Sequence, residues 1–132
     1  MRRTTHVTRI ILGVVFVVFG LNGFVLFITP PEHSAAGGKF IDLLMSSGYM
    51  YVEKLLEIIG GALLLANRYV MLGLVILGPL VVNILLFHLF LERHTLVIGV
   101  VPFVLWAWLI WVNRRQLRPL VGRQEELTPK RQ

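Results

Sequence analysis

The sequence predicts an all-α fold: a bundle of four transmembrane helices with a short amphipathic or re-entrant segment after the first helix. Of the 132 residues, 56% are hydrophobic and 15% are charged, and the mean hydropathy is +0.76. A soluble domain is typically about 45–50% apolar and about 25% charged. Long uncharged runs also recur along the chain. These observations indicate one membrane domain over residues 1–112 and a basic cytoplasmic tail over residues 113–132.

The first predicted span covers residues 10–28, a run of 19 residues without a charge. A helix of that length rises about 28 Å, which is enough to cross the hydrocarbon of a bilayer. Pro30 and Pro31 follow the run and should end the helix. A cleaved signal peptide is the alternative, but the apolar run exceeds the about 7–15 residues of a signal core.

A short helix is predicted in the long connection that follows, residues 29–48. Phe40, Ile41, Leu44 and Met45 recur at the spacing of one helical face. This pattern predicts an amphipathic segment that lies on the outer surface of the membrane or dips into it.

Three further spans are predicted, at residues 49–66, 69–91 and 96–112. The last two of these are free of charged residues, whereas the first carries three charges in its first half. We nevertheless predict a span there, because short connections force helices to pack as antiparallel neighbours.

The distribution of Lys and Arg predicts the orientation. Ten of the 13 basic residues fall on one side of this topology and three on the other. Since cytoplasmic segments are enriched in Lys and Arg, both termini are predicted to be cytoplasmic, with the chain in a bacterial inner membrane. The net charge of +6 comes from helix ends in contact with the lipid bilayer, so nucleic acid is not an expected partner.

Glu57 is the most informative residue, because an intramembrane carboxylate costs about 2.5–3.5 kcal/mol even on lenient insertion scales. The predicted topology places Asn22, Asn83 and His88 at a similar depth, in the outer half of the bundle. These four residues form the predicted polar cluster, which we expect to line a pocket open to the outside.

The roles of these polar residues stay open at this stage. Glu53 and Lys54 are predicted at the pocket mouth, and Glu57 is predicted to act with His88, as a functional pair or an ion pair. The alternative is that the cluster only joins helices, at about 0.6 kcal/mol for each polar pair. The chain has no cysteine, which excludes thiol chemistry, and its histidines lack metal-ligand spacing, so no metal site is predicted.

The chain resembles the DoxX-like family of small four-helix integral membrane proteins. The resemblance rests on residues 9–13 and 19–24, on the Glu-x-x-Gly-Gly run that opens residues 57–65, and on the Pro-x3-Asn-x4-His run within residues 78–91. Together these matches extend over roughly residues 9–112.

The resemblance implies a redox-associated accessory subunit, since the name-giving relatives pass electrons from sulfur compounds to quinone. A quinone would then be the cofactor, and a redox partner protein would supply the electrons. Two alternatives remain: a non-enzymatic scaffold or assembly protein, and a small carrier or channel, which would need a homo-oligomer. No catalytic motif is present, so the sequence does not predict an activity of the chain on its own.

Overall fold

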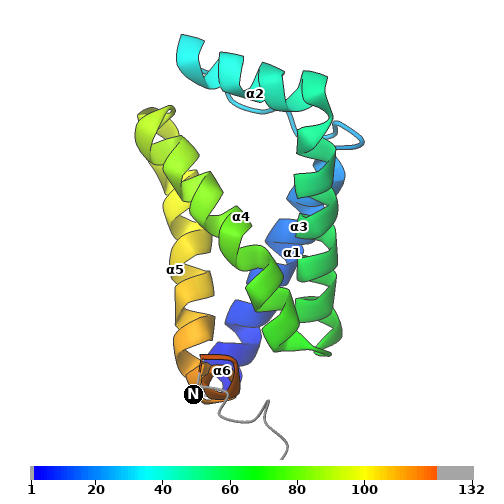
Figure 1. Ribbon diagram of the computed structural model, residues 1–132, viewed down its shortest axis with the longest axis vertical. Helices are drawn as coiled ribbons and strands as arrows, with labels where there is room; N and C mark the ends of the chain where they lie inside the picture. Colours follow the sequence, from blue (N-terminus) through cyan, green and yellow to red (C-terminus); the bar gives the residue numbers. More distant parts are fainter. Residues whose placement is uncertain (1, 122–132) are drawn as a thin grey trace, which may run out of the picture.

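The computed structural model describes residues 2–121, and this part of the chain is helical without any strand. The prediction of an all-α fold is confirmed for these residues. The elements in chain order are α1 (Arg2–Asn22), α2 (Ala35–Ser47), α3 (Tyr49–Ala66), α4 (Val70–Phe90), the 3-10 helix η1 (Arg93–Thr95), α5 (Leu96–Val112) and α6 (Arg114–Val121) (Figure 1).

The four long helices α1, α3, α4 and α5 run alternately up and down the bundle (Figure 1). α1 starts at the end where α6 lies, and α2 lies across the opposite end. We call these the α6 end and the α2 end. Residues 122–132 of the predicted basic tail lie outside the described residues.

Three of the long helices match their predicted ranges. α3 covers residues 49–66, and the bounds of α4 and α5 fall within one residue of the predicted 69–91 and 96–112. Uncharged runs bounded by polar turns therefore locate α4 and α5 well, and the short connections around α3 locate that helix.

The first predicted span, residues 10–28, is corrected at both ends. α1 already begins at Arg2 and ends at Asn22. The Asn22 side chain accepts hydrogen bonds from the backbone N–H groups of Phe27 and Ile28, at 2.9 and 2.8 Å. The apolar residues after Asn22 therefore fold back as a loop, consistent with the turn preference of an Asn-Gly pair.

Within residues 2–121, three helices are long and apolar enough to cross a membrane: α1, α4 and the helical stretch Arg93–Val112. α3 is also 18 residues long, but its first half carries three charged side chains. It lies along α1, its most extensive neighbour, and also packs on α4.

Glycines allow the close contact between α1 and α3. A Cβ atom added to Gly61 would lie 2.8 Å from the carbonyl oxygen of Gly13, and one added to Gly13 would lie 3.1 Å from that of Gly61. Small residues at such positions let two membrane helices approach backbone to backbone. A Cβ atom on Gly20, nearer the α2 end, would likewise lie 3.0 Å from the carbonyl oxygen of Lys54, so α1 and α3 stay in close contact over much of their length.

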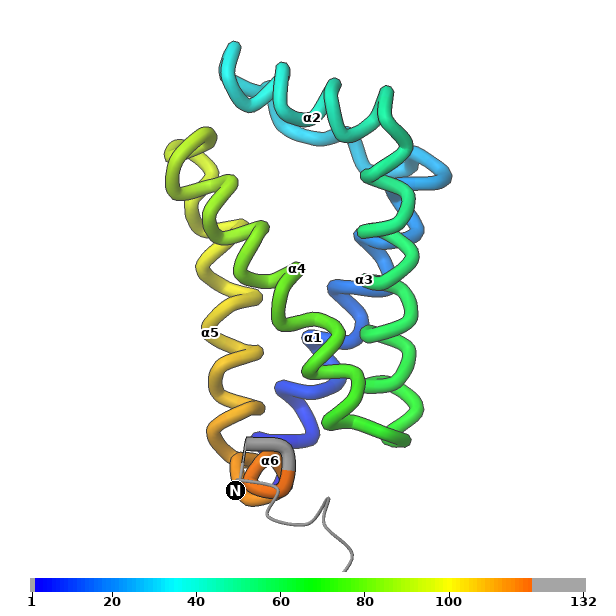
Figure 2. Tube along the Cα trace, in the orientation of Figure 1, coloured from blue at the N-terminus to red at the C-terminus, as the bar shows by residue number. Residues whose placement is uncertain are grey.

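The buried core also lies toward the α6 end, while the helices diverge toward the α2 end (Figure 2). The α1–α3 pair and the α4–α5 pair separate there, and α2 spans the interval. The core consists of Leu12, Phe16, Leu64, Leu74, Leu77, Leu80, Val81 and Leu109.

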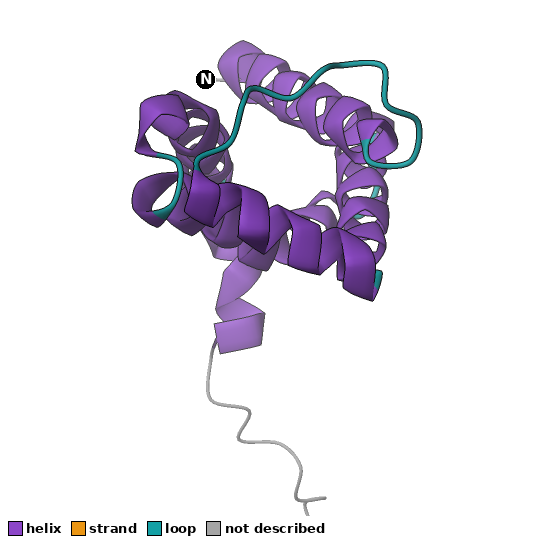
Figure 3. Cartoon of the chain, turned by 90° about the horizontal axis from the view of Figure 1, so that it is seen from above, coloured by secondary structure: helices purple, strands orange, loops and turns teal. Residues whose placement is uncertain are grey.

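α2 lies across one side of the open end of the bundle, and the loop before it runs along the other side (Figure 3). We call α2 the roof. Ser34 caps its first turn by accepting the N–H of Gly37 at 3.0 Å. Gly48, with φ of +80°, ends α2 and turns the chain directly into α3, a conformation that glycine adopts without strain. The predicted amphipathic segment is therefore a helix attached to α3 through a single residue.

Candidate functional site

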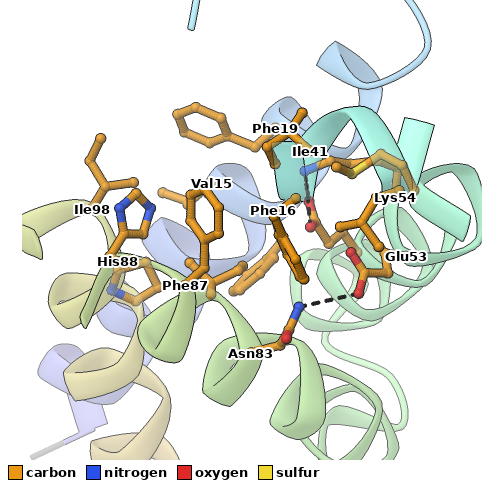
Figure 4. Close-up of a pocket in the computed structure, with 16 residues that line it drawn as sticks. Val15, Phe16, Phe19, Ile41, Glu53, Lys54, Asn83, Phe87, His88 and Ile98 are labelled. Carbon is orange, nitrogen blue, oxygen red and sulfur yellow. Dashed lines mark hydrogen bonds and ion pairs between the residues drawn. The ribbon is translucent and has the colours of Figure 1, made fainter. Parts of the chain in front are cut away.

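A cavity of about 220 Å³ lies beneath α2, between the diverging helices. The helices α1 to α5 all contribute to its lining (Figure 4). Most of the lining is aromatic or aliphatic, and three of the four residues of the predicted polar cluster also line it: Glu57, Asn83 and His88.

One side of the cavity is formed by charged residues of α3. Lys54 Nζ lies 3.1 Å from both carboxylate oxygens of Glu57, which is buried, while Lys54 is mostly buried. Asn83 Nδ2 of α4 donates to Glu53 Oε1 at 3.2 Å. Glu53 and Lys54, predicted at the mouth, therefore line the cavity itself.

The other side of the cavity is formed by His88 of α4. Its Nδ1 lies 2.8 Å from Thr95 Oγ1, and that hydroxyl donates its proton to the main-chain oxygen of Glu92 at 3.1 Å. Since a hydroxyl has a single proton, the arrangement assigns the N–H of a neutral imidazole to Nδ1. The lone pair of His88 is then on Nε2, where it can accept a hydrogen bond.

The predicted ion pair between Glu57 and His88 is not formed. Glu57 is paired with Lys54 on its own helix, and His88 is bonded to Thr95. In Figure 4, His88 and Ile98 lie on one side of the pocket and Lys54 on the other, with Phe16 between them. The position of each residue along its helix was predictable from the sequence, but the direction of each side chain around the helix was not.

Asn22, the fourth residue of the predicted cluster, does not line the cavity. Its side chain is occupied by the loop that follows α1, where it also donates to the carbonyl oxygen of Ile28 at 3.1 Å. Its role in the structure is to shape this loop.

A buried carboxylate that the sequence analysis treated as loop, Glu92, fixes the roof. Its side chain is 1% exposed, and Oε1 accepts hydrogen bonds from the Ser34 N–H at 2.6 Å and the Ser34 hydroxyl at 2.8 Å. His33 Nδ1 lies 3.8 Å from Oε1 and His94 Nδ1 lies 3.3 Å from Oε2. We call the contact between Ser34 and Glu92 the latch.

The latch limits which residue fits at position 37, and it affects the pKa of Glu92. A Cβ atom on Gly37 would overlap Glu92 Oε1, so only glycine fits under the carboxylate. Burial acts to raise the pKa of Glu92, but the Ser34 hydrogen bonds and the nearby histidines outweigh it and hold the pKa below its ordinary value. The only sequence signal was Ser34 followed by small residues, typical of a helix N-terminus.

The arrangement offers hydrogen bonding at two ends of an aromatic slot. At one end are the Lys54 ammonium, two carboxylates and the Asn83 amide, and at the other is the imidazole of His88. Within residues 2–121, no three His, Asp or Glu side chains are grouped so as to hold a metal ion. The polar groups at the two ends are placed to hydrogen-bond a small molecule lying between them.

Comparison with known proteins gives one relative. The chain is 32% identical over 127 aligned residues to the uncharacterized protein YwoB of Bacillus subtilis (strain 168), covering 90% of this chain and 82% of that protein. No family model and no solved structure matches the chain.

Proposed function

The chain belongs to the same family as YwoB of Bacillus subtilis, and we propose that it is an integral membrane protein that binds a small lipid-soluble ring beneath α2. The ring we favour is the headgroup of a quinone. The observation that carries the proposal is the cavity of about 220 Å³ with polar groups at two opposite ends.

The size and lining of the cavity suit such a ligand. Pockets for drug-sized molecules usually have volumes of about 300–1,000 Å³, so a cavity of about 220 Å³ suits a single substituted ring. Phe16 and Phe87 provide aromatic surface for its faces, and an isoprenoid tail would extend between the diverging helices into lipid.

The two polar ends match the two carbonyl oxygens of a quinone. The Lys54 ammonium and the Asn83 amide can donate to one oxygen. His88 Nε2 can donate to the other when protonated and can accept from the hydroxyl of the reduced ring. A bound quinone would supply the electron-accepting chemistry, with the electrons coming from a partner protein. The chain's part is to orient the ring, exclude water and hold protons at Glu57 and His88.

The membrane arrangement belongs to the same proposal. We place α3 as a fourth span beside α1, α4 and α5, with the α6 end in the cytoplasm and the DoxX-like proteins as wider relatives. Of the ten basic residues within 2–121, seven lie at the α6 end, and the other three of the 13 follow α6 in the sequence, which supports this orientation.

Single cysteines test the orientation cleanly, because the natural chain has none. In intact cells, an impermeant thiol reagent should label cysteines placed at the exposed positions Ala35 and His94. It should not label one at Gln116. Labelling at Gln116 but not at Ala35 would reverse the orientation.

Thermal unfolding in mild detergent tests the ligand. A short-chain quinone should raise the melting temperature of the natural protein, since it binds the folded state. His88→Ala should remove the rise, whereas His94→Ala, an equivalent change outside the cavity, should keep it. No rise at any soluble concentration, with no quinone co-purifying, would refute quinone binding.

A structural role is the second candidate, and the bond between Asn83 and Glu53 favours it because it joins α4 to α3. In that case Asn83→Leu should lower stability whether or not a ligand is present. A carrier is the weakest candidate, since fully buried leucines such as Leu12, Leu64 and Leu77 fill the bundle below the cavity.

A further inference from the structure

A second hollow, of about 410 Å³, lies at the α6 end, opposite the pocket beneath α2. Residues of α1, of the α3–α4 connection, of α4 and of the α5–α6 region line it. Its lining includes several polar side chains, among them Arg9, Asn67, Asn113 and Gln116.

Arg9 is the distinctive residue of this hollow, because it is a buried cation without a carboxylate partner in the described part of the chain. It is 8% exposed. Its guanidinium donates to the carbonyl oxygen of Leu64 at the end of α3, and Nη2 lies 3.3 Å from His6 Nδ1. These contacts engage two of the five N–H groups of a guanidinium, and they leave the charge uncompensated.

No acidic side chain within residues 2–121 lies near the hollow. The five acidic residues of this range belong to the loop before α2, to α2, to the first half of α3 and to the α4–α5 connection, all toward the α2 end. Arginines instead surround the hollow's end of the bundle: Arg2, Arg3, Arg68, Arg114, Arg115 and Arg118. Their summed field attracts anions.

The start of α4 adds N–H donors at the same place. Val70 and Met71 begin this helix and line the hollow, and no side chain caps the helix there. Free N–H groups at a helix start favour an anion, and a guanidinium matches a phosphate through paired hydrogen bonds.

We propose that this hollow binds a phosphate-bearing anion through Arg9. Two sources have this chemistry: the headgroup of an anionic phospholipid and a soluble phosphate. The hollow lies at the end of three helices that are apolar enough to cross a membrane, so a lipid phosphate at the bilayer surface is within its reach. This proposed anion site does not depend on the ligand that we propose beneath α2.

The test measures melting temperature in mild detergent with three additives at equal concentration: short-chain phosphatidylglycerol, short-chain phosphatidylcholine and inorganic phosphate. For a lipid site, phosphatidylglycerol should raise the melting temperature most. An equal rise with inorganic phosphate would assign the site to a soluble phosphate. No rise with either anion would overturn the proposal.

Variants test whether the rise in melting temperature depends on residues of the hollow. Arg9→Lys keeps the charge but not the paired geometry, and it should weaken the apparent affinity about tenfold or more. Because Arg9 also bonds the end of α3, a second variant leaves it in place: Gln116→Glu sets a negative charge at the exposed rim and should abolish the rise. Lys39→Gln makes an equal change of net charge at the α2 end and should have no effect. A rise that survives both Arg9→Lys and Gln116→Glu would also overturn the proposal.

Discussion

The two ends of the bundle are built from the same four long helices but held together by different forces. At the α6 end, glycines and fully buried leucines bring the helices into close contact. At the α2 end the helices diverge, and the residues between them include charged and polar side chains beside aromatic and aliphatic ones. The contrast teaches that tight apolar packing at one end allows the other end to stay open and to hold polar side chains under a separate roof.

Breaking the tight end should have the largest effect on stability. A valine at Gly61 would meet the Gly13 carbonyl oxygen and the backbone of Val17, and backbone cannot move aside as a flexible side chain does. Gly61→Val should therefore destabilise the protein by about 3 kcal/mol, the upper part of the range for overpacking. Thermal unfolding in detergent measures this loss, and the neighbouring exposed Ala62→Val is the control. Equal effects of the two changes would show that the close contact is unimportant.

The charged side of the cavity should show a smaller, coupled effect. Glu57→Gln leaves the Lys54 ammonium without its buried partner, at about 1–3 kcal/mol. Lys54→Met should also destabilise, and the double variant should lose less than the sum of the two, since the residues bond each other. Strictly additive losses in unfolding experiments would contradict the pair.

The latch between Ser34 and Glu92 should contribute a few degrees of melting temperature. Glu92→Gln removes the anion that accepts the Ser34 hydrogen bonds. Because the pKa of Glu92 is lowered in the folded protein, its stabilisation is complete at neutral pH and is lost as pH falls through that lowered value. The difference in melting temperature between the natural protein and Glu92→Gln should therefore shrink in acid. A difference independent of pH would show that the charge of Glu92 does not matter.

Asn22 should give the smallest effect, since it ends α1 outside the cavity and its side chain bonds only an exposed loop. Asn22→Ala should destabilise by about 1 kcal/mol through lost hydrogen bonds and should leave binding beneath α2 unchanged. Asn83→Ala provides the comparison within the cavity. A loss of ligand binding with Asn22→Ala would show that the loop after α1 shapes the pocket.

Sequence patterns predicted most of the helices because apolar periodicity and turn residues are local. The bounds of α3, α4 and α5 followed from them, while the end of α1 depended on Asn22 bonding residues five and six positions later. Depth along each helix also brought Glu57, Asn83 and His88 into one cavity correctly.

The partners of the cavity residues could not be predicted in this way. Whether Glu57 meets Lys54 or His88 depends on rotation about the helix axes, which packing decides. The latch joins residues 58 positions apart, and nothing in a local pattern connects Ser34 to Glu92. Long-range polar contacts of this kind can be identified only once the helices are placed in three dimensions.

The latch also sets an order of assembly. The chain is synthesised from its N-terminus, so the roof helix α2 is made before Glu92. Until α4 has been made and the turn after it has formed, Ser34 has no carboxylate to bond, and α2 is held only by the loop from α1, by Gly48 and by its contacts with α3. The cavity beneath α2 is therefore completed late in biogenesis, because a nascent chain that stops short of residue 92 lacks the carboxylate that holds Ser34.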